Sequence, residues 1–230
     1  REVDAIVHVV RCFNDSDVIH VSGKIDPLDD IQIINLELIL SDLNQLQKRR
    51  GKIKKQIKTN KDSEKEDLLL QVIEKDLENG TPIRSIELSK EEKNIIKPLF
   101  FLTNKPIIYA ANLSENDLSI GNGFSKLVQD FATKEGSECI KISAQVESEL
   151  IELSKTEKLD YLNGLGVKEG GLISLIKATY KLLGLRTYFT TGEKETKAWT
   201  IRNGMTAPQA AREIHTDFEK GFIRAQTISY

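Results

Sequence analysis

The apolar residues of this chain form short unbroken runs separated by longer helical stripes, which is the pattern of an α/β protein. The runs at residues 3–10, 106–111 and 138–142 are rich in β-branched and aliphatic side chains. Such runs predict strands that are buried on both faces of a parallel sheet. The helical stripes between them predict helices that alternate with these strands, and this order indicates a doubly wound α/β sheet.

Two long helical patterns between the first two predicted strands indicate an inserted helical hairpin. Asp26-Pro27 supplies an N-cap followed by proline at the first helical position, and this helix runs towards Arg50. The capping box Ser63–Glu66 begins a second helix, which Asn79-Gly80 ends. Because both helices carry one apolar stripe and a polar turn at residues 59–62 joins them, they predict a coiled-coil arm.

The remaining elements are expected from caps and periodicity. Further helices are predicted at 89–102, 124–134, 148–165 and 171–185. The pattern changes near residue 185, after which two short strands, a helix that begins at Thr206 and a strand at 223–228 are predicted. A hairpin followed by a helix and a strand is the opening of a β-grasp domain, which the printed chain does not complete.

The composition fits an ordinary globular protein. Of the 230 residues 39% are hydrophobic, 30% are charged and the net charge is −2, so no global field points to DNA or a membrane. No apolar run reaches about 18 residues, which excludes a transmembrane helix, and the first residues do not resemble a signal peptide. Cys12 and Cys139 are predicted to be reduced, buried thiols of a cytoplasmic protein, and nothing at ligand spacing suggests a metal site.

Two polar segments follow directly after predicted strands, where ligands bind in sheets of this kind. They are Asn112–Glu115 and Ser143-Ala144. In GTPases the corresponding loops carry Asn-Lys-x-Asp, whose Asp accepts two hydrogen bonds from guanine, and Ser-Ala. Here Leu113 stands in place of the Lys and Glu115 in place of the Asp. The segments therefore predict a purine pocket formed by Asn112, Leu113, Glu115, Ser143 and Ala144, which prefers ATP to GTP.

At these residues the whole chain resembles the YchF/Obg-like ATPase family, a branch of the Obg-related P-loop proteins. The resemblance is carried by the segments His8–Phe13, Ile19–Lys24, Asp29-Asp30, Asn112–Glu115, Tyr188–Thr190, Lys197–Thr200, Ala207–Ala211 and His215–Ile223. It implies the C-terminal half of a P-loop NTPase domain over residues 1–47 and 104–185, a coiled-coil arm over 48–103 and an incomplete TGS domain, a β-grasp module, over 186–230. It also implies that Leu113 contacts adenine largely through its backbone.

The resemblance implies an ATPase that also accepts GTP in some members, uses Mg²⁺ and associates in the cytoplasm with the ribosome or translation factors. The P-loop pattern Gly-x-x-x-x-Gly-Lys-Ser/Thr, the switch threonine and the Asp-x-x-Gly turn are absent from the printed sequence. These parts, including the Mg²⁺ ligands, are expected before residue 1. The printed chain is therefore expected to bind a base but to be inactive as an enzyme when alone.

A basic segment of the arm raises an alternative function, a non-enzymatic adaptor that binds ribosomal RNA through the arm and the TGS domain. The candidate RNA-binding residues are Arg49, Arg50, Lys52, Lys54 and Lys55. Neighbouring carboxylates leave a second interpretation open, in which the same charges belong to a solvated arm tip. Tyr188 and Trp199 are likewise open to base stacking or to core packing of their hairpin.

Overall fold

The computed structural model describes residues 1–15, 25–54, 56 and 61–229. The resemblance segment Ile19–Lys24 and the candidate Lys55 lie outside the described residues. The chain divides into two compact units, Arg1–Leu175 and Ile176–Tyr230. Each unit is described by itself. Within the described residues no helix combines the length and the apolar character needed to cross a bilayer.

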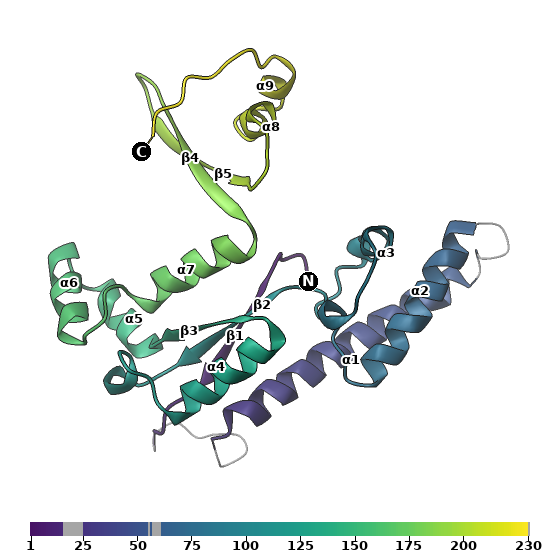
Figure 1. The fold of residues 1–230 in the computed structure, drawn as a ribbon, viewed down its shortest axis with the longest axis horizontal. Coiled ribbons are helices and arrows are strands. Elements are labelled where there is room, and N and C mark those ends of the chain that lie inside the picture. The colour runs from purple at the N-terminus through teal and green to yellow at the C-terminus, as the bar shows by residue number, and fades with distance from the viewer. Residues whose placement is uncertain (16–24, 55, 57–60, 230) are drawn as a thin grey trace. The chain divides into compact units, whose positions relative to one another are not determined.

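Three parallel strands form the sheet of the first unit (Figure 1). They are β1 (Ile6–Arg11), β2 (Ile107–Asn112) and β3 (Glu138–Ile142), in the order β1-β2-β3. In register, Arg11 lies opposite Asn112, and Asn112 lies opposite Ile142. The carboxyl ends of the three strands therefore meet at one edge, and the loops that follow β2 and β3 begin side by side.

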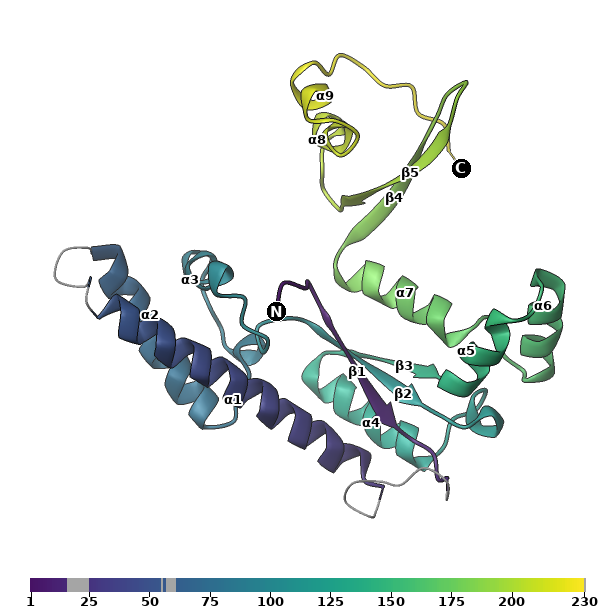
Figure 2. The same cartoon turned by 180° about the vertical axis from the view of Figure 1, so that it is seen from behind.

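Helices α1 (Pro27–Ile53) and α4 (Gly123–Glu135) pack against this sheet. Ile31 of α1 and Val128 of α4 share one hydrophobic core with alternate residues of the strands, including Val10 and Tyr109. The view from behind shows the same arrangement (Figure 2). This parallel sheet with packed helices confirms the predicted mixed α/β fold class.

The prediction that the first strand is buried on both faces is wrong. Val7 is 39% exposed and Val9 is 56% exposed, whereas Val10 on the opposite face is buried. β1 is an edge strand of the described sheet, and among the described residues nothing covers its second face as α1 and α4 cover the first. The unbroken apolar run therefore correctly predicts a strand, but it does not predict that one face of this strand is exposed.

The arm consists of the C-terminal half of α1 packed on α2 (Lys61–Glu78), as Figure 1 shows. Its core contains Leu46, Ile53, Leu70, Ile73 and Leu77, each almost fully buried. Asp26 caps α1 through its side chain and Pro27 is the first helical residue, as predicted. The capping box predicted at Ser63 is wrong, because α2 begins at Lys61 and Ser63 lies buried inside the helix. Of the predicted polar turn, residues 59 and 60 lie outside the described part.

The other helices of the first unit correct two boundary predictions, and the first concerns the helix predicted over 89–102, which ends at Ile96 and is followed by a 3₁₀ turn. They are α3 (Lys90–Ile96), α5 (Ala144–Ile151), α6 (Lys155–Gly164) and α7 (Gly171–Leu182), which continues into the second unit; one-turn 3₁₀ helices occupy Ile83–Ser85, Lys97–Leu99 and Glu115–Asp117. The predicted capping box at Ser89 is present. The single helix predicted over 148–165 is wrong, because Ser154 forms its own capping box with Glu157 and begins α6. A cap inside the apolar stripe thus divides it into two helices.

The second unit contains an antiparallel hairpin and two short helices. They are β4 (Leu185–Thr191), β5 (Thr196–Arg202), α8 (Ala207–Arg212) and α9 (Thr216–Lys220). Tyr188 Oη donates to the Ala210 carbonyl and Trp199 Nε1 donates to Thr190 Oγ1, so both rings are tied into the unit. The strand predicted at 223–228 is wrong, because these residues pair with no strand in the described part and Ile223 is 91% exposed.

Cys12 and Cys139 are both free thiols. Cys12 is fully buried, and burial raises the pKa of its thiol to about 12. Cys139 is half-buried, and burial again raises its pKa. The predicted burial is confirmed for Cys12 and only in part for Cys139. Raised pKa values keep both sulfurs in the unreactive thiol form at neutral pH.

A buried carboxylate joins α1 to the segment that leads into β2. Asp42, with no exposed surface, accepts hydrogen bonds from the Leu102 amide (3.0 Å), the Thr103 amide (2.7 Å) and the Thr103 hydroxyl (2.8 Å). Arg1 Nη1 lies 2.6 Å from the same carboxylate. Asp42 therefore satisfies backbone donors that would otherwise be buried without partners.

We predict that Asp42→Ala lowers the free energy of unfolding by about 3 kcal/mol, because it leaves buried donors unsatisfied. Urea unfolding measures the difference. The control is Glu78→Ala at an exposed position of α2, which we expect to change stability by less than about 0.5 kcal/mol. Equal effects of the two substitutions would contradict the role of Asp42.

Candidate functional site

The two segments predicted to frame a purine pocket are joined by a hydrogen bond. Asn112 Oδ1 accepts from the Ala144 amide at 2.9 Å. The Asn112 carbonyl accepts from the Cys12 amide at 2.8 Å, which ties the same residue to the end of β1. Asn112 thus links the ends of all three strands, because parallel order places them at one edge of the sheet.

Leu113 is held between the sheet and its helices. Its side chain is only 2% exposed and belongs to the core beneath α1 and α4. Its amide donates to the Ile142 carbonyl at 2.8 Å. Because the residue as a whole is only 2% exposed, its side chain is not available to a ligand, and the predicted backbone contact with adenine stays a prediction.

Ser143 and Ala144 begin α5. Ser143 is 1% exposed and is the N-cap, and its hydroxyl accepts from the Val146 amide at 3.5 Å. Ala144 is exposed, but Asn112 occupies its amide. The role of Ser143 is thus to cap the helix and hold its first turn, while Ala144 presents a small surface beside the Asn112 loop.

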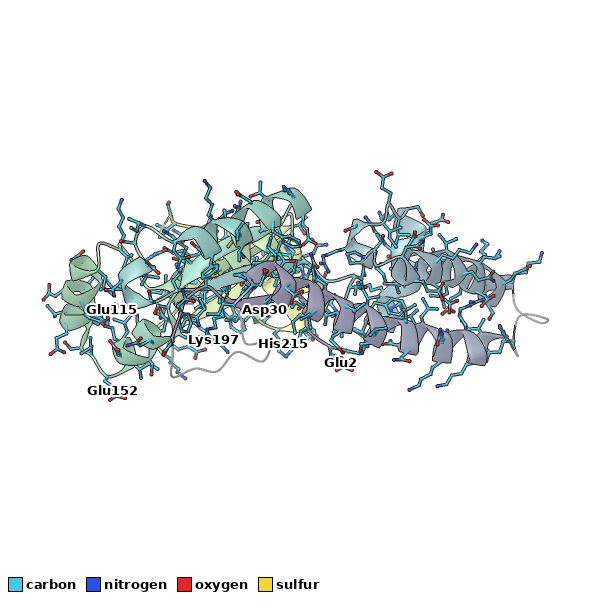
Figure 3. The ribbon with its side chains drawn as sticks, turned by 90° about the horizontal axis from the view of Figure 1, so that it is seen from below. Glu2, Asp30, Glu115, Glu152, Lys197 and His215 are labelled. Atoms are coloured by element: carbon cyan, nitrogen blue, oxygen red, sulfur yellow. The ribbon has the colours of Figure 1, made fainter. Side chains whose placement is uncertain are left out.

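Glu115 begins a one-turn 3₁₀ helix and lies at the end of the first unit that is remote from the arm (Figure 3). Its Oε1 accepts from Tyr161 Oη at 3.0 Å. The same hydroxyl lies 2.5 Å from Glu149 Oε2 on α5. The hydrogen bond to Glu149, followed by desolvation and the bond to Glu115, raises the pKa of Tyr161, so the phenol stays protonated at neutral pH.

The loop after β2 is braced further by residues that no sequence motif pointed to as part of a site. Asn122 Nδ2 donates to the Cys12 carbonyl (2.7 Å) and to Asp117 Oδ2 (2.8 Å), and Ser114 Oγ donates to the same Asp117 oxygen (3.1 Å). Asn122 also caps α4. Only the N-cap pattern before α4 could have identified Asn122. Nothing in the sequence relates Tyr161 or Glu149 to Glu115, because 46 residues separate Tyr161 from Glu115.

Two cavities adjoin this region of the first unit. One, of about 830 Å³, lies among α5, α6 and α7 and includes Ala144 and Glu147 in its wall. The other, of about 780 Å³, is lined by the residues before α4, by β3 and by the segment before α7. Asn112, Leu113 and Glu115 line neither of them. Within the described residues no group of three or more His, Cys, Asp or Glu side chains is placed to hold a metal ion.

The basic residues of the arm fall into two groups. Arg49 forms two hydrogen bonds to Glu66, at 2.7 and 2.8 Å, and Arg50 binds Asp67 at 2.8 Å and also Glu74. The hydrogen bond from Arg50 lowers the pKa of Asp67. These two arginines therefore join α1 to α2. Lys52 and Lys54 are exposed instead.

Comparison with known proteins gives consistent matches. Residues 185–230 match the family model YchF-GTPase_C, described as a protein of unknown function (DUF933). The whole chain aligns with 64% of the ribosome-binding ATPase YchF of Bacillus subtilis, and the two are 47% identical over that length. It aligns with 63% of the ribosome-binding ATPase YchF of Escherichia coli O157:H7 at 48% identity. The solved structure of the Schizosaccharomyces pombe YchF GTPase superposes on this chain with a TM-score of 0.83 and 37% sequence identity. The match covers 96% of this chain and 61% of the Schizosaccharomyces pombe chain. The chain therefore spans somewhat less than two thirds of these relatives.

We predict that Asn112→Ala accelerates hydrogen exchange of the Ala144 amide about fivefold, because one hydrogen bond of about 1 kcal/mol is removed. Exchange followed by NMR measures it. The matched control is Asn116→Ala, in the same loop. An unchanged exchange rate at Ala144 in the Asn112 variant would show that this hydrogen bond does not hold the two segments together.

Proposed function

Because this chain belongs to the YchF family, we propose that it forms the base-recognition part of a P-loop NTPase that binds and hydrolyses ATP in preference to GTP. The observation that carries the preference is the state of the backbone donors at the strand ends. The Leu113 amide donates to Ile142, and the Ala144 amide donates to Asn112. Both donors are therefore committed within the protein.

Adenine and guanine differ in what they require from such a pocket. Guanine presents an O6 acceptor, which needs a donor, whereas adenine presents an N6 amine, which needs an acceptor. Because both amides are already used, we propose that a backbone carbonyl of the Asn112–Glu115 loop accepts from the adenine amine. A guanine O6 at the same place would remain without a donor, and an unpaired buried polar group weakens binding.

The phosphate chemistry of the proposed reaction requires residues that the printed sequence does not contain. No P-loop pattern occurs in it. We therefore assign to this chain the binding and orientation of the base, and we expect it to be inactive alone. Its proposed domains are the NTPase part (1–47 and 104–185), the arm (48–103) and the TGS domain (186–230).

The partners follow from the relatives rather than from the site. The curated relatives are named ribosome-binding ATPases. We propose that the intact protein likewise binds the ribosome in the cytoplasm, where the arm and the TGS domain would contact ribosomal RNA or translation factors. ATP with Mg²⁺ is the proposed cofactor of the intact protein.

A non-enzymatic RNA-binding function of the arm is the second candidate, and the exposure of Lys52 and Lys54 favours it. Lys55 completes the candidate set but lies outside the described residues. Arg49 and Arg50 are less suited to bind phosphate, because each is already paired with carboxylates of α2. Binding of RNA through these lysines would release counterions and depend on salt.

For the intact protein we predict tighter binding of ATP than of GTP and a preference that falls about tenfold in Glu115→Asp, where the shorter carboxylate suits guanine and reaches Tyr161 less well. Calorimetric titration with each nucleotide measures the ratio. Glu152→Asp, on the exposed end of α5, is the matched control. Intact protein that binds neither nucleotide, or binds GTP more tightly, would refute the proposed function.

For the adaptor function we predict that the printed chain binds ribosomal RNA. Replacing Lys52, Lys54 and Lys55 with Gln should reduce the slope of log affinity against log salt concentration by about one unit for each phosphate that is no longer bound. Filter binding over a salt series measures the slope. Replacing Lys90, Lys93 and Lys97 on and beside α3 with Gln controls for net charge, since these lysines are exposed away from the arm tip. Equal reductions in both triple variants would argue against a binding site at the arm tip.

A further inference from the structure

One hydroxyl group links the Asn112–Glu115 loop to the helix that begins after Ser143. Tyr161 Oη lies 3.0 Å from Glu115 Oε1 and 2.5 Å from Glu149 Oε2. Glu149 is part of α5, whose first amide binds Asn112. The loop is therefore attached to α5 at two points, directly through Asn112 and indirectly through Tyr161.

The ring of Tyr161 is fixed by packing. It lies against a small core formed by Leu118, Val146, Leu150 and Leu162, all of them buried. These residues come from the loop after β2, from α5 and from α6. The hydroxyl of Tyr161 consequently has a defined position, and the Glu115 side chain has to be oriented towards it for the hydrogen bond to form.

This hydrogen bond changes what Glu115 can offer to a purine. A carboxylate that reads guanine in the manner of the GTPase loop uses both oxygens, one for N1–H and one for the exocyclic amine. The hydrogen bond from Tyr161 uses one of the two acceptor sites of Oε1 and fixes the direction of the carboxylate. A carboxylate held in this way cannot turn freely to align both oxygens with the two guanine donors. Adenine carries no such pair of donors on that edge and loses nothing.

We propose that Tyr161 is a specificity-determining positioning residue, which holds Glu115 by one oxygen and so weakens the binding of guanine nucleotides relative to adenine nucleotides. The inference rests on the proposed function, since it concerns the base pocket of the same nucleotide site. Tyr161 acts through Glu115 and does not touch the reacting atoms.

The geometry also predicts an opposite effect for Glu149. A phenol has one proton and can donate to one acceptor at a time, so the two carboxylates compete for it. In Glu149→Gln the amide can donate to the phenol oxygen, and the phenol proton is then given to Glu115. This substitution strengthens the hold on Glu115, whereas Tyr161→Phe removes it.

The test measures ATP and GTP dissociation constants of the intact protein by calorimetric titration. Tyr161→Phe is expected to lower the ratio of ATP to GTP affinity about tenfold, which corresponds to one hydrogen bond to a charged group. The expected change is mainly tighter binding of GTP. Glu149→Gln is expected to leave the ratio unchanged or to raise it. Tyr188→Phe, which removes a hydroxyl bound to the Ala210 carbonyl in the other unit, is the matched control and should leave the ratio at the wild-type value.

The outcomes separate this inference from the proposed function. Wild-type protein that binds no nucleotide overturns the proposed function, and the inference with it. Wild-type protein that prefers ATP, with an unchanged ratio in Tyr161→Phe, overturns the inference alone. A lowered ratio in both Tyr161→Phe and Glu149→Gln also overturns it, because a general loosening of the loop would then explain both. Thermal melting of each variant tests whether it folds. If Tyr161→Phe does not fold, the Glu149→Gln variant decides. A lowered ratio of ATP to GTP affinity in that variant overturns the inference, and an unchanged or raised ratio supports it.

Discussion

The parallel pairing of three strands is the constraint on which the candidate site depends. It places the ends of β1, β2 and β3 at one edge, so that Asn112 can accept from Ala144 and be held by Cys12 at the same time. With the sheet in this order, two polar segments about 30 residues apart become one surface. In the proposed function, the hydrogen bonds that join them also use the backbone donors a guanine would need, and these same interactions would then bias the choice of base.

Helix α1 connects this site region to the arm as one continuous element. Ile31 near its start belongs to the core of the sheet, whereas Leu46 and Ile53 near its end belong to the core of the arm. Asp42 lies between these two parts and binds the backbone that leads into β2. Because no break separates the two halves of α1, one continuous helix contributes side chains to both cores.

The sequence predicts those features that depend on local chemistry. The caps at Asp26 and Ser89 and the strand end at Ile142 are found where the pattern placed them, and β2 extends one residue beyond the predicted end, to Asn112. Features that depend on tertiary surroundings were missed. The exposed face of β1 and the unformed strand at 223–228 depend on which neighbours are present, and Tyr161 reaches Glu115 only through the packing of α6. The division between α5 and α6 was the exception, since the Ser154–Glu157 capping box was present in the sequence but was outweighed by the apolar stripe.

A crystal structure of the intact protein with a non-hydrolysable ATP analogue is the most direct test of the base-recognition role. The adenine ring should lie beside the Asn112–Glu115 loop and Ala144, with its N6 amine within about 3.2 Å of a backbone carbonyl of that loop. Glu115 should remain bound to Tyr161 in that complex. An adenine ring seated elsewhere, or turned so that its N6 amine meets no backbone carbonyl of this loop, would contradict the proposed site.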